Sequence, residues 1–250
     1  MIELKTAREL EKMKKACQIS AEAIKVAQSA LQVGVSTAYV DDKVREYIVS
    51  QGARPTFLGY GGFPKSACIS VNEELIHGIP SKNRIIKDGD IVSVDVGAFI
   101  DGYTGDNAAT FAIGNVSEEA KRLMAVTKDS LLRAVEVCVP GNRIGDIGYA
   151  VQSYVEENGY SIVRDYVGHG VGKKLHEDPE VPNFGKPGHG ARLVPGMTIA
   201  IEPMVNLGRP EVEVLANDWT VVTMDRQLSA HFEYSVAITD KGPVVLTQWG

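Results

Sequence analysis

The stretch Asp90-Ile-Val-Ser-Val-Asp-Val-Gly-Ala-Phe-Ile-Asp-Gly-Tyr-Thr-Gly-Asp-Asn-Ala-Ala-Thr110 predicts two antiparallel strands joined at Asp101-Gly102. This dipeptide tolerates the positive φ angles that a two-residue hairpin turn requires. Pairing the two arms across the turn sets Gly97 opposite Asp106. Because side chains alternate along a strand, Asp95 then lies on the same face, diagonal to Asp106. The hairpin therefore aims two carboxylates at one place.

An ordinary half-solvated hairpin would show the same alternation of residues. Ser93 and Asp95 would then face water, while the valines between them face the core. Gly97 and Gly105 favour the other interpretation, in which the sheet leaves room for a ligand above it. The hairpin alone leaves both interpretations open.

Composition and charge limit the classes of function. The chain has 250 residues, of which 44% are hydrophobic and 23% charged, as in ordinary globular proteins. A net charge of −6 disfavours nucleic acid as a direct partner, and no apolar run is long enough to span a membrane. The N-terminus predicts a charged helix start instead of a signal peptide. Cys17, Cys68 and Cys138 are widely spaced, which favours reduced thiols and a cytoplasmic protein.

The order of predicted elements suggests an internal repeat. Capping residues and glycine stops predict helices over residues 7–31, 37–52, 117–140 and 144–159. Alternating apolar residues predict strands over residues 67–71, 160–167, 197–205, 212–216, 219–224, 231–239 and 244–248. Gly34, Gly52 and Gly61 recur with the same spacing as Gly141, Gly159 and Gly168. We expect an α+β protein with one domain over residues 1–250, made of similar halves at approximately 1–115 and 116–250.

Further candidate ligands lie in the second half of the chain. Glu202 and Glu233 interrupt apolar strand-like runs, where a carboxylate is costly to bury unless a cation or several donors meet it. His169 lies between two glycines, and His176 follows it closely. Each residue alone has an ordinary explanation, such as a loop histidine, a solvated strand edge or an arginine partner. His231, on the same face as Glu233, is as readily a surface group as a ligand.

The set taken together indicates metal chemistry. Four carboxylates and a histidine form an oxygen-rich ligand set. Such a set suits Mn, Fe or Co better than it suits a structural zinc ion, whose sites are built on thiolates. Such a set can hold two ions ~3.5–4 Å apart, as in dinuclear hydrolases.

The motifs that carry these residues resemble the type I methionine aminopeptidases over the whole chain. The resemblance rests on the spacing of Asp95 and Asp106 and on further segments that follow the family's order. These segments are Gly59-Tyr-Gly-Gly-Phe-Pro-Lys-Ser66, Asn72-Glu-Glu-Leu-Ile-His-Gly-Ile-Pro80, Gly168-His-Gly-Val-Gly172, Thr198-Ile-Ala-Ile-Glu-Pro-Met204 and His231-Phe-Glu-Tyr234.

This resemblance implies the pita-bread fold and a dinuclear site of Co, Mn, Fe or Zn. Asp106 and Glu233 would bridge the two ions, Asp95 would complete one site, and His169 with Glu202 the other. Glu202 would also accept a proton from the attacking water. His77 and His176 would contact the substrate and stabilise the oxyanion.

The resemblance also implies an apolar, polarizable pocket for methionine. Leu175 stands where many family members carry an aromatic residue, which affects the pocket's shape but not the chemistry. Plain core packing explains Phe57 equally well. The expected lining is Phe57, Tyr60, Phe63, Cys68, Leu175 and Trp219.

The implied function is removal of the N-terminal methionine from nascent polypeptides, with a preference for a small second residue. A monomer is expected, with the ribosome as a candidate partner. The absence of a zinc-finger extension and of a long insert favours the bacterial form. A proline-specific aminopeptidase or prolidase is an alternative, although those enzymes usually carry an N-terminal domain for which this chain has no room. A pita-bread binding module without metals is another, although all five ligand positions hold competent residues.

Overall fold

The computed structural model describes residues 1–249, and its helices begin at the predicted caps. Thr6 and Glu9 form the predicted capping box. Ser36 and Ser117 accept hydrogen bonds from backbone N–H groups three residues later. The helices are α1 (Ala7–Ala30), α2 (Thr37–Ser50), α3 (Glu118–Glu136) and α4 (Ile144–Glu157), with a short 3-10 turn, η1 (Tyr60–Gly62).

The strands form small antiparallel sheets, and the first contains the central hairpin. Its members are β1 (Arg54–Pro55), β2 (Ala67–Val71), β4 (Ile91–Ile100) and β5 (Tyr103–Ala112), in the order β1-β4-β2 with β5 on β4. The largest sheet has the order β15-β14-β9-β7-β8 and contains β7 (Gly168–Gly170), β8 (Glu177–Val181), β9 (Thr198–Ile201), β14 (Tyr234–Thr239) and β15 (Gly242–Val245).

Two three-stranded sheets complete the described strands. One has the order β13-β10-β6 and contains β6 (Ser161–Ile162), β10 (Met204–Asn206) and β13 (Ser229–His231). The other has the order β11-β12-β3 and contains β3 (Glu74–Ile76), β11 (Val212–Val214) and β12 (Val221–Thr223).

The central hairpin has the predicted register. Gly97 pairs with Asp106, and Ile100 pairs with Tyr103 across the turn. Asp101 and Gly102 have positive φ angles of 54° and 88°, as a two-residue turn of this type requires. The two aspartates therefore share a face of the sheet.

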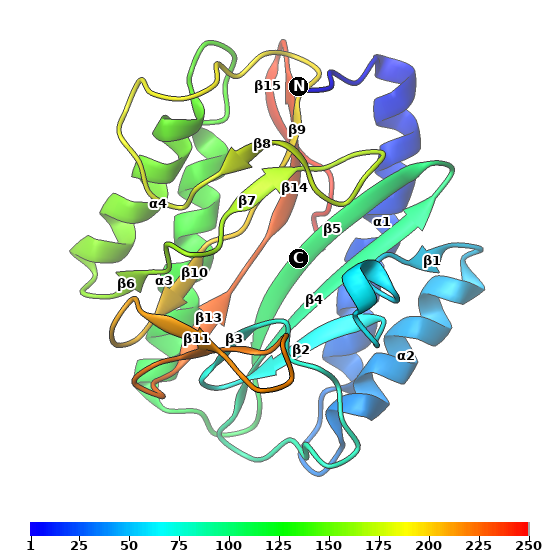
Figure 1. The fold of residues 1–250 in the computed structure, drawn as a ribbon, viewed down its shortest axis with the longest axis vertical. Helices are drawn as coiled ribbons and strands as arrows, with labels where there is room; N and C mark the ends of the chain where they lie inside the picture. Colours follow the sequence, from blue (N-terminus) through cyan, green and yellow to red (C-terminus); the bar gives the residue numbers. More distant parts are fainter. Residues whose placement is uncertain (250) are drawn as a thin grey trace.

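Helix pairs lie on either side of the strands. In Figure 1, α1 and α2 lie to the right of the strands and α3 and α4 to the left, with the β4–β5 hairpin crossing the middle. The structure confirms the predicted α+β architecture.

Gly105 has a different role from the predicted one. A Cβ atom at this position would come within 2.4 Å of the Cys17 backbone, so Gly105 lets α1 pack closely against the hairpin. Neighbouring residues of a strand point to opposite faces of the sheet. Gly105 and its partner Ala98 therefore lie on the face opposite to that of Asp106. The prediction that Gly105 leaves room for a ligand is wrong.

The predicted strands of the second half are shorter and broken. Pro203 has no backbone N–H and separates β9 from β10, which belong to different sheets. Glu233 likewise lies between β13 and β14. The predicted strand over residues 160–167 shrinks to β6. The edge strand β8 was not predicted, because Glu177-Asp-Pro-Glu-Val181 has the composition of a loop.

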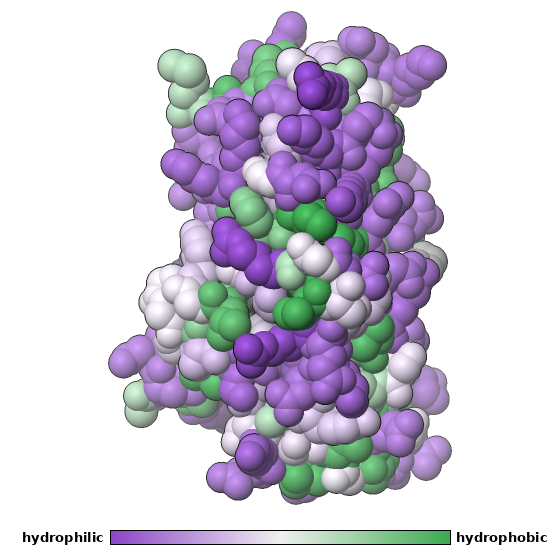
Figure 2. Space-filling view, turned by 90° about the vertical axis from the view of Figure 1, so that its right-hand side faces the viewer, coloured by the Kyte–Doolittle hydropathy of each residue, from purple (hydrophilic) through white to green (hydrophobic). Residues whose placement is uncertain are grey.

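Within residues 1–249, no helix combines the length and apolar character needed to cross a bilayer. The face seen in Figure 2 is mostly hydrophilic, with apolar side chains in small separate groups. Cys17, Cys68 and Cys138 are buried, free thiols, as predicted.

Candidate active site

A single cavity brings together all the residues that the sequence singled out as candidate ligands and substrate contacts. It encloses about 130 Å³ and opens to solvent. Its lining consists of Phe57, Tyr60, Phe63, Cys68, His77, Asp95, Asp106, His169, Leu175, His176, Glu202, Trp219 and Glu233. The set is drawn from both halves of the chain.

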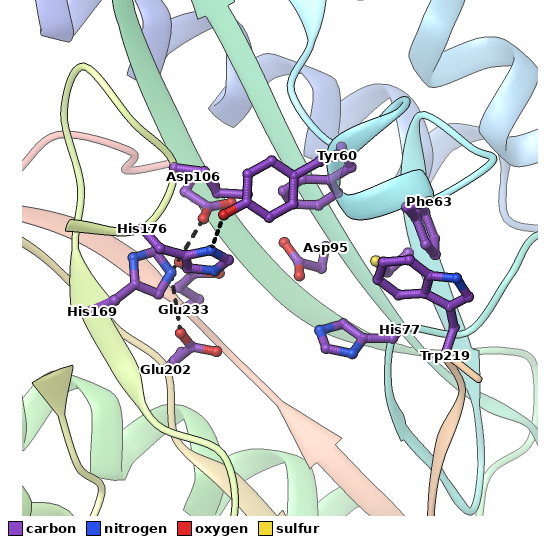
Figure 3. Close-up of a pocket in the computed structure, with 13 residues that line it drawn as sticks. Tyr60, Phe63, His77, Asp95, Asp106, His169, His176, Glu202, Trp219 and Glu233 are labelled. Atoms are coloured by element: carbon purple, nitrogen blue, oxygen red, sulfur yellow. Dashed lines mark hydrogen bonds and ion pairs between the residues drawn. The ribbon is translucent and has the colours of Figure 1, made fainter. Parts of the chain in front are cut away.

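Four carboxylates form one part of this cavity, which we call the acidic floor: Asp95, Asp106, Glu202 and Glu233. Asp95 and Asp106 come from the hairpin β4–β5, and the two glutamates lie at the strand breaks. Figure 3 shows the four carboxylates directed toward a common space. Asp106 and Glu233 are 3% and 2% exposed, so water contributes little to their solvation.

Backbone hydrogen bonds hold the second half of the chain against the hairpin at this floor. The Glu233 N–H donates to the Ala108 carbonyl at 2.9 Å. The Ser235 hydroxyl donates to the Asp106 carbonyl at 2.8 Å and accepts a hydrogen bond from the Asp106 N–H at 3.3 Å. Strand backbone therefore fixes the separation of these carboxylates.

His169 reaches the floor from β7. Its Nε2 lies 3.7 Å from Asp106 Oδ2 and 3.5 Å from Glu202 Oε1. Its Nδ1 donates to the Gly170 carbonyl at 2.8 Å, which places the proton on Nδ1 and leaves Nε2 able to act as a ligand. Burial lowers the pKa of His169 to about 4, so the ring is neutral near pH 7.

Burial also raises the pKa of every carboxyl group in the floor. The pKa values of Asp106 and Glu233 lie well above their usual range, first because of desolvation and then because of the neighbouring acids. The pKa of Asp95 and that of Glu202 are raised by desolvation as well. A bound cation would offset both contributions.

The donor atoms fit divalent metal ions. Asp95 Oδ1, Asp106 Oδ1 and Glu233 Oε1 are buried and have no hydrogen-bond partner in the described chain. Ligand atoms of Asp106, His169 and Glu233 lie within 4.8 Å of one another. Buried, unpaired carboxylate oxygens beside an imidazole nitrogen form a donor set for Mn, Fe, Co or Zn ions.

His231, whose role the sequence left open, also faces this floor. It is 1% exposed, and its Nε2 lies 3.5 Å from Glu202 Oε2. Glu202 therefore lies between two imidazoles, those of His169 and His231. The signal in the sequence was its position two residues before Glu233 on the same strand face.

The opposite part of the cavity is built mainly by loops, and we call it the loop wall: Phe57, Tyr60, Phe63, Leu175, His176 and Trp219. Four of its side chains form an apolar cluster with Cys68, namely Phe57, Phe63, Leu175 and Trp219. The Phe63 and Trp219 rings meet edge to face with centroids 5.1 Å apart. Tyr60 stands at the mouth and is 45% exposed.

Two neutral histidines connect the loop wall with the floor. His176 contacts the Tyr60 hydroxyl through Nδ1 at 2.6 Å and meets the His169 ring edge-on at 4.3 Å. The ring of His77 packs edge-on against that of Trp219, with the ring centroids 6.2 Å apart (Figure 3). Burial lowers the pKa of both, that of His77 to about 4. Near pH 7, each can donate one N–H to an oxygen in the cavity.

Comparison with known proteins places this geometry in context. The sequence matches the model of metallopeptidase family M24 over residues 11–240. Methionine aminopeptidase of Clostridium acetobutylicum is 54% identical over 247 residues, 99% of each chain. The crystal structure of methionine aminopeptidase from Thermotoga maritima gives a TM-score of 0.98 at 46% identity and covers 99% of this chain and 100% of that chain.

Prolidases share the architecture at lower similarity. The prolidase from Pyrococcus furiosus gives a TM-score of 0.79 at 27% identity, and covers 98% of this chain but 65% of that chain. The shared architecture confirms the predicted pita-bread fold.

Proposed function

The chain belongs to the methionine aminopeptidases of metallopeptidase family M24, and on that premise we propose that it removes the N-terminal methionine from nascent polypeptides. The observation that carries the proposal is the single cavity in which a metal-type acidic floor faces an apolar loop wall.

The family uses divalent metal ions, and we propose that two of them bind at the acidic floor. Asp106 and Glu233 would contact both ions, Asp95 one of them, and His169 with Glu202 the other. The ions are Co, Mn, Fe or Zn. When bound, they would lower the pKa of a water molecule and polarise the scissile carbonyl.

The chain's own residues have three tasks in this proposal. Glu202 would accept the proton of the attacking water, because its Oε1 lies 3.5 Å from His169 Nε2 and so faces the space proposed for the ions. In the tautomer whose Nδ1 accepts the Tyr60 proton, His176 carries its own proton on Nε2 and can donate it to the developing oxyanion. His77 donates from the other side.

The loop wall selects the substrate. Aromatic rings and the Cys68 thiol offer a polarizable surface to a thioether. Leu175 is 5% exposed and has a smaller side chain than the aromatic residue of many family members, which leaves more room near the methionine side chain. We propose a preference for a small second residue, as the likeness to the methionine aminopeptidases implies.

We further propose that residues 1–250 act as one catalytic domain with halves near 1–115 and 116–250. Hydrogen bonds from Glu233 and Ser235 to the hairpin support this, because they join the halves at the site itself. A monomer is part of the same proposal. We propose a cytoplasmic location, where nascent polypeptides are made, with the ribosome as a candidate partner.

A peptide assay tests the specificity directly. Metal-depleted protein is supplied with Mn, Co, Fe or Zn ions and given Met-Ala-Ser and Pro-Ala-Ser peptides, and the released amino acid is identified. Release of methionine alone is expected. Release of proline would support the prolidase alternative, and no release from folded protein with any metal would support the binding module.

A further inference from the structure

A buried lysine that the proposed chemistry does not use lies beside the loop that carries His176. The side chains of Lys5 and Glu177 form an ion pair and are 3% and 7% exposed. Lys5 Nζ also donates to the Glu3 carbonyl at 3.1 Å. Buried charges are expensive to desolvate, so their retention here calls for a reason beyond stability.

Glu177 closes the segment of residues 171–177, which we call the His176 loop. Its Oε1 accepts the Lys174 N–H at 3.1 Å, while Oε2 receives Lys5. Leu175 and His176 lie in the chain between Lys174 and Glu177, which this hydrogen bond joins. At the other end of the loop, the Thr104 N–H donates to the Gly172 carbonyl at 2.7 Å. One end of the loop is thus held by the strand of Asp106. The other end is held by the pairing of Glu177 with Gly170 between β8 and β7 and by the Glu177 carboxylate bound to Lys5.

Gly172 makes room for this ion pair. A Cβ atom there would lie 2.4 Å from Lys5 Cε and 2.9 Å from Glu177 Oε1. A larger residue would therefore push the lysine away from the loop. The loop backbone and the lysine are fitted to each other.

We propose that Lys5 is a positioning residue, whose ion pair with Glu177 holds His176 at the cavity. This inference rests on the proposed function of His176 as an oxyanion donor. The other contacts of the His176 side chain, to the partly exposed Tyr60 and to the His169 ring, do not fix its backbone. A shift of ~1 Å in such a group can lower a rate ~100-fold.

The molecule provides a matched control in the same region. Lys173 pairs with Glu3 at 3.6 Å and with Glu9 at 3.4 Å, so it too joins the N-terminal segment to the His176 loop. Its side chain is 53% exposed, and exposed pairs of this kind contribute little. Lys173→Met therefore removes a similar charge from the same surroundings without breaking the buried pair.

The test compares kinetic constants for methionine release from Met-Ala-Ser. Lys5→Met is expected to lower kcat ~10- to 100-fold with KM changed less than ~3-fold. Lys5→Arg should recover most of kcat, and Lys173→Met should match wild type. Glu177→Gln is a second variant for the case in which Lys5→Met folds poorly, and it should lower kcat by a similar factor. Mn affinity measured by calorimetry should stay within ~2-fold in all variants, because the acidic floor is untouched.

A double-variant cycle separates positioning from general destabilisation. In a His176→Ala background, Lys5→Met should lower kcat by less than ~2-fold, because the group it positions is already gone. An equal loss in both backgrounds, or a Lys5→Met enzyme as active as wild type, would overturn the proposal.

Amide hydrogen exchange gives a readout that does not depend on activity. Exchange over residues 172–176 should be faster in Lys5→Met and unchanged in Lys173→Met. Failure of the proposed function would appear as no methionine release by the wild type. Failure of this inference would appear as unchanged exchange together with unchanged kcat.

Discussion

The acidic floor and the loop wall meet in one cavity but are built differently. The floor carboxylates come from strands or strand breaks, and the buried Asp106 and Glu233 are held by hydrogen bonds such as that from the Glu233 N–H to the Ala108 carbonyl. The loop wall is carried mainly by irregular segments and includes the partly exposed Tyr60. The difference indicates a division of labour, in which the floor provides the reaction and the wall provides substrate selection and orientation.

Replacing a floor carboxylate should have the largest effect. Asp106→Asn removes the carboxylate that the proposal assigns to both ions, and we expect activity to fall at least ~1000-fold. Metal affinity should fall by more than the ~10- to 100-fold loss typical of residues that only support ligands. Calorimetric titration with Mn and methionine release check both. The metal-free variant should be no less stable than wild type, because a neutral amide avoids the cost of ionising a buried carboxyl group. Unchanged Mn affinity would contradict the assignment.

Removing a donor from the loop side should have a smaller effect. His176→Ala should lower kcat ~100- to 1000-fold, the usual loss for one oxyanion donor, while Mn affinity stays nearly constant. Steady-state kinetics with calorimetry measure this contrast. If His176→Ala lost metal as Asp106→Asn does, the proposed division between floor and wall would be wrong.

The floor should also reveal itself in the pH dependence of stability. In metal-free protein the raised pKa values of Asp106 and Glu233 mean that the folded state retains protons that the unfolded state releases above about pH 4. The free energy of unfolding should therefore fall as pH rises from about 7 to 8, above the range in which the lowered pKa values of His77 and His169 give the opposite slope. Urea unfolding with a chelator measures the slope, and Asp106→Asn should show a shallower one. A flat or rising profile in the wild type would argue against a buried acidic floor.

A change of pocket shape should have the smallest effect. Leu175→Phe adds volume beside Phe63 and Trp219 and should alter KM for methionyl peptides by up to ~10-fold with little change in kcat. Kinetics on Met-Ala-Ser and on a peptide with norleucine in place of methionine give the measurement. A loss confined to kcat would place Leu175 with the reacting groups.

The sequence predicted the parts of the site that depend on local rules. The Asp101-Gly102 turn determines the hairpin register, and the register determines that Asp95 and Asp106 share a face. The caps at Thr6, Ser36 and Ser117 likewise define helix starts by local chemistry.

Features that depend on tertiary contacts were not predictable. Glu202 was placed inside a continuous strand, whereas Pro203 moves the chain from one sheet to another. The burial of His231 against Glu202 and the pairing of Lys5 with Glu177 join residues far apart in the sequence. No periodicity or spacing carries that information.

The central claim is that divalent ions held by the acidic floor enable methionine release. The most direct measurement is the rate of methionine release from Met-Ala-Ser by metal-depleted protein as Mn is added stepwise. We predict no release without metal and a rate that rises until the two proposed sites are filled. If methionine is released as fast with a chelator and no Mn as it is with Mn added, the account is contradicted.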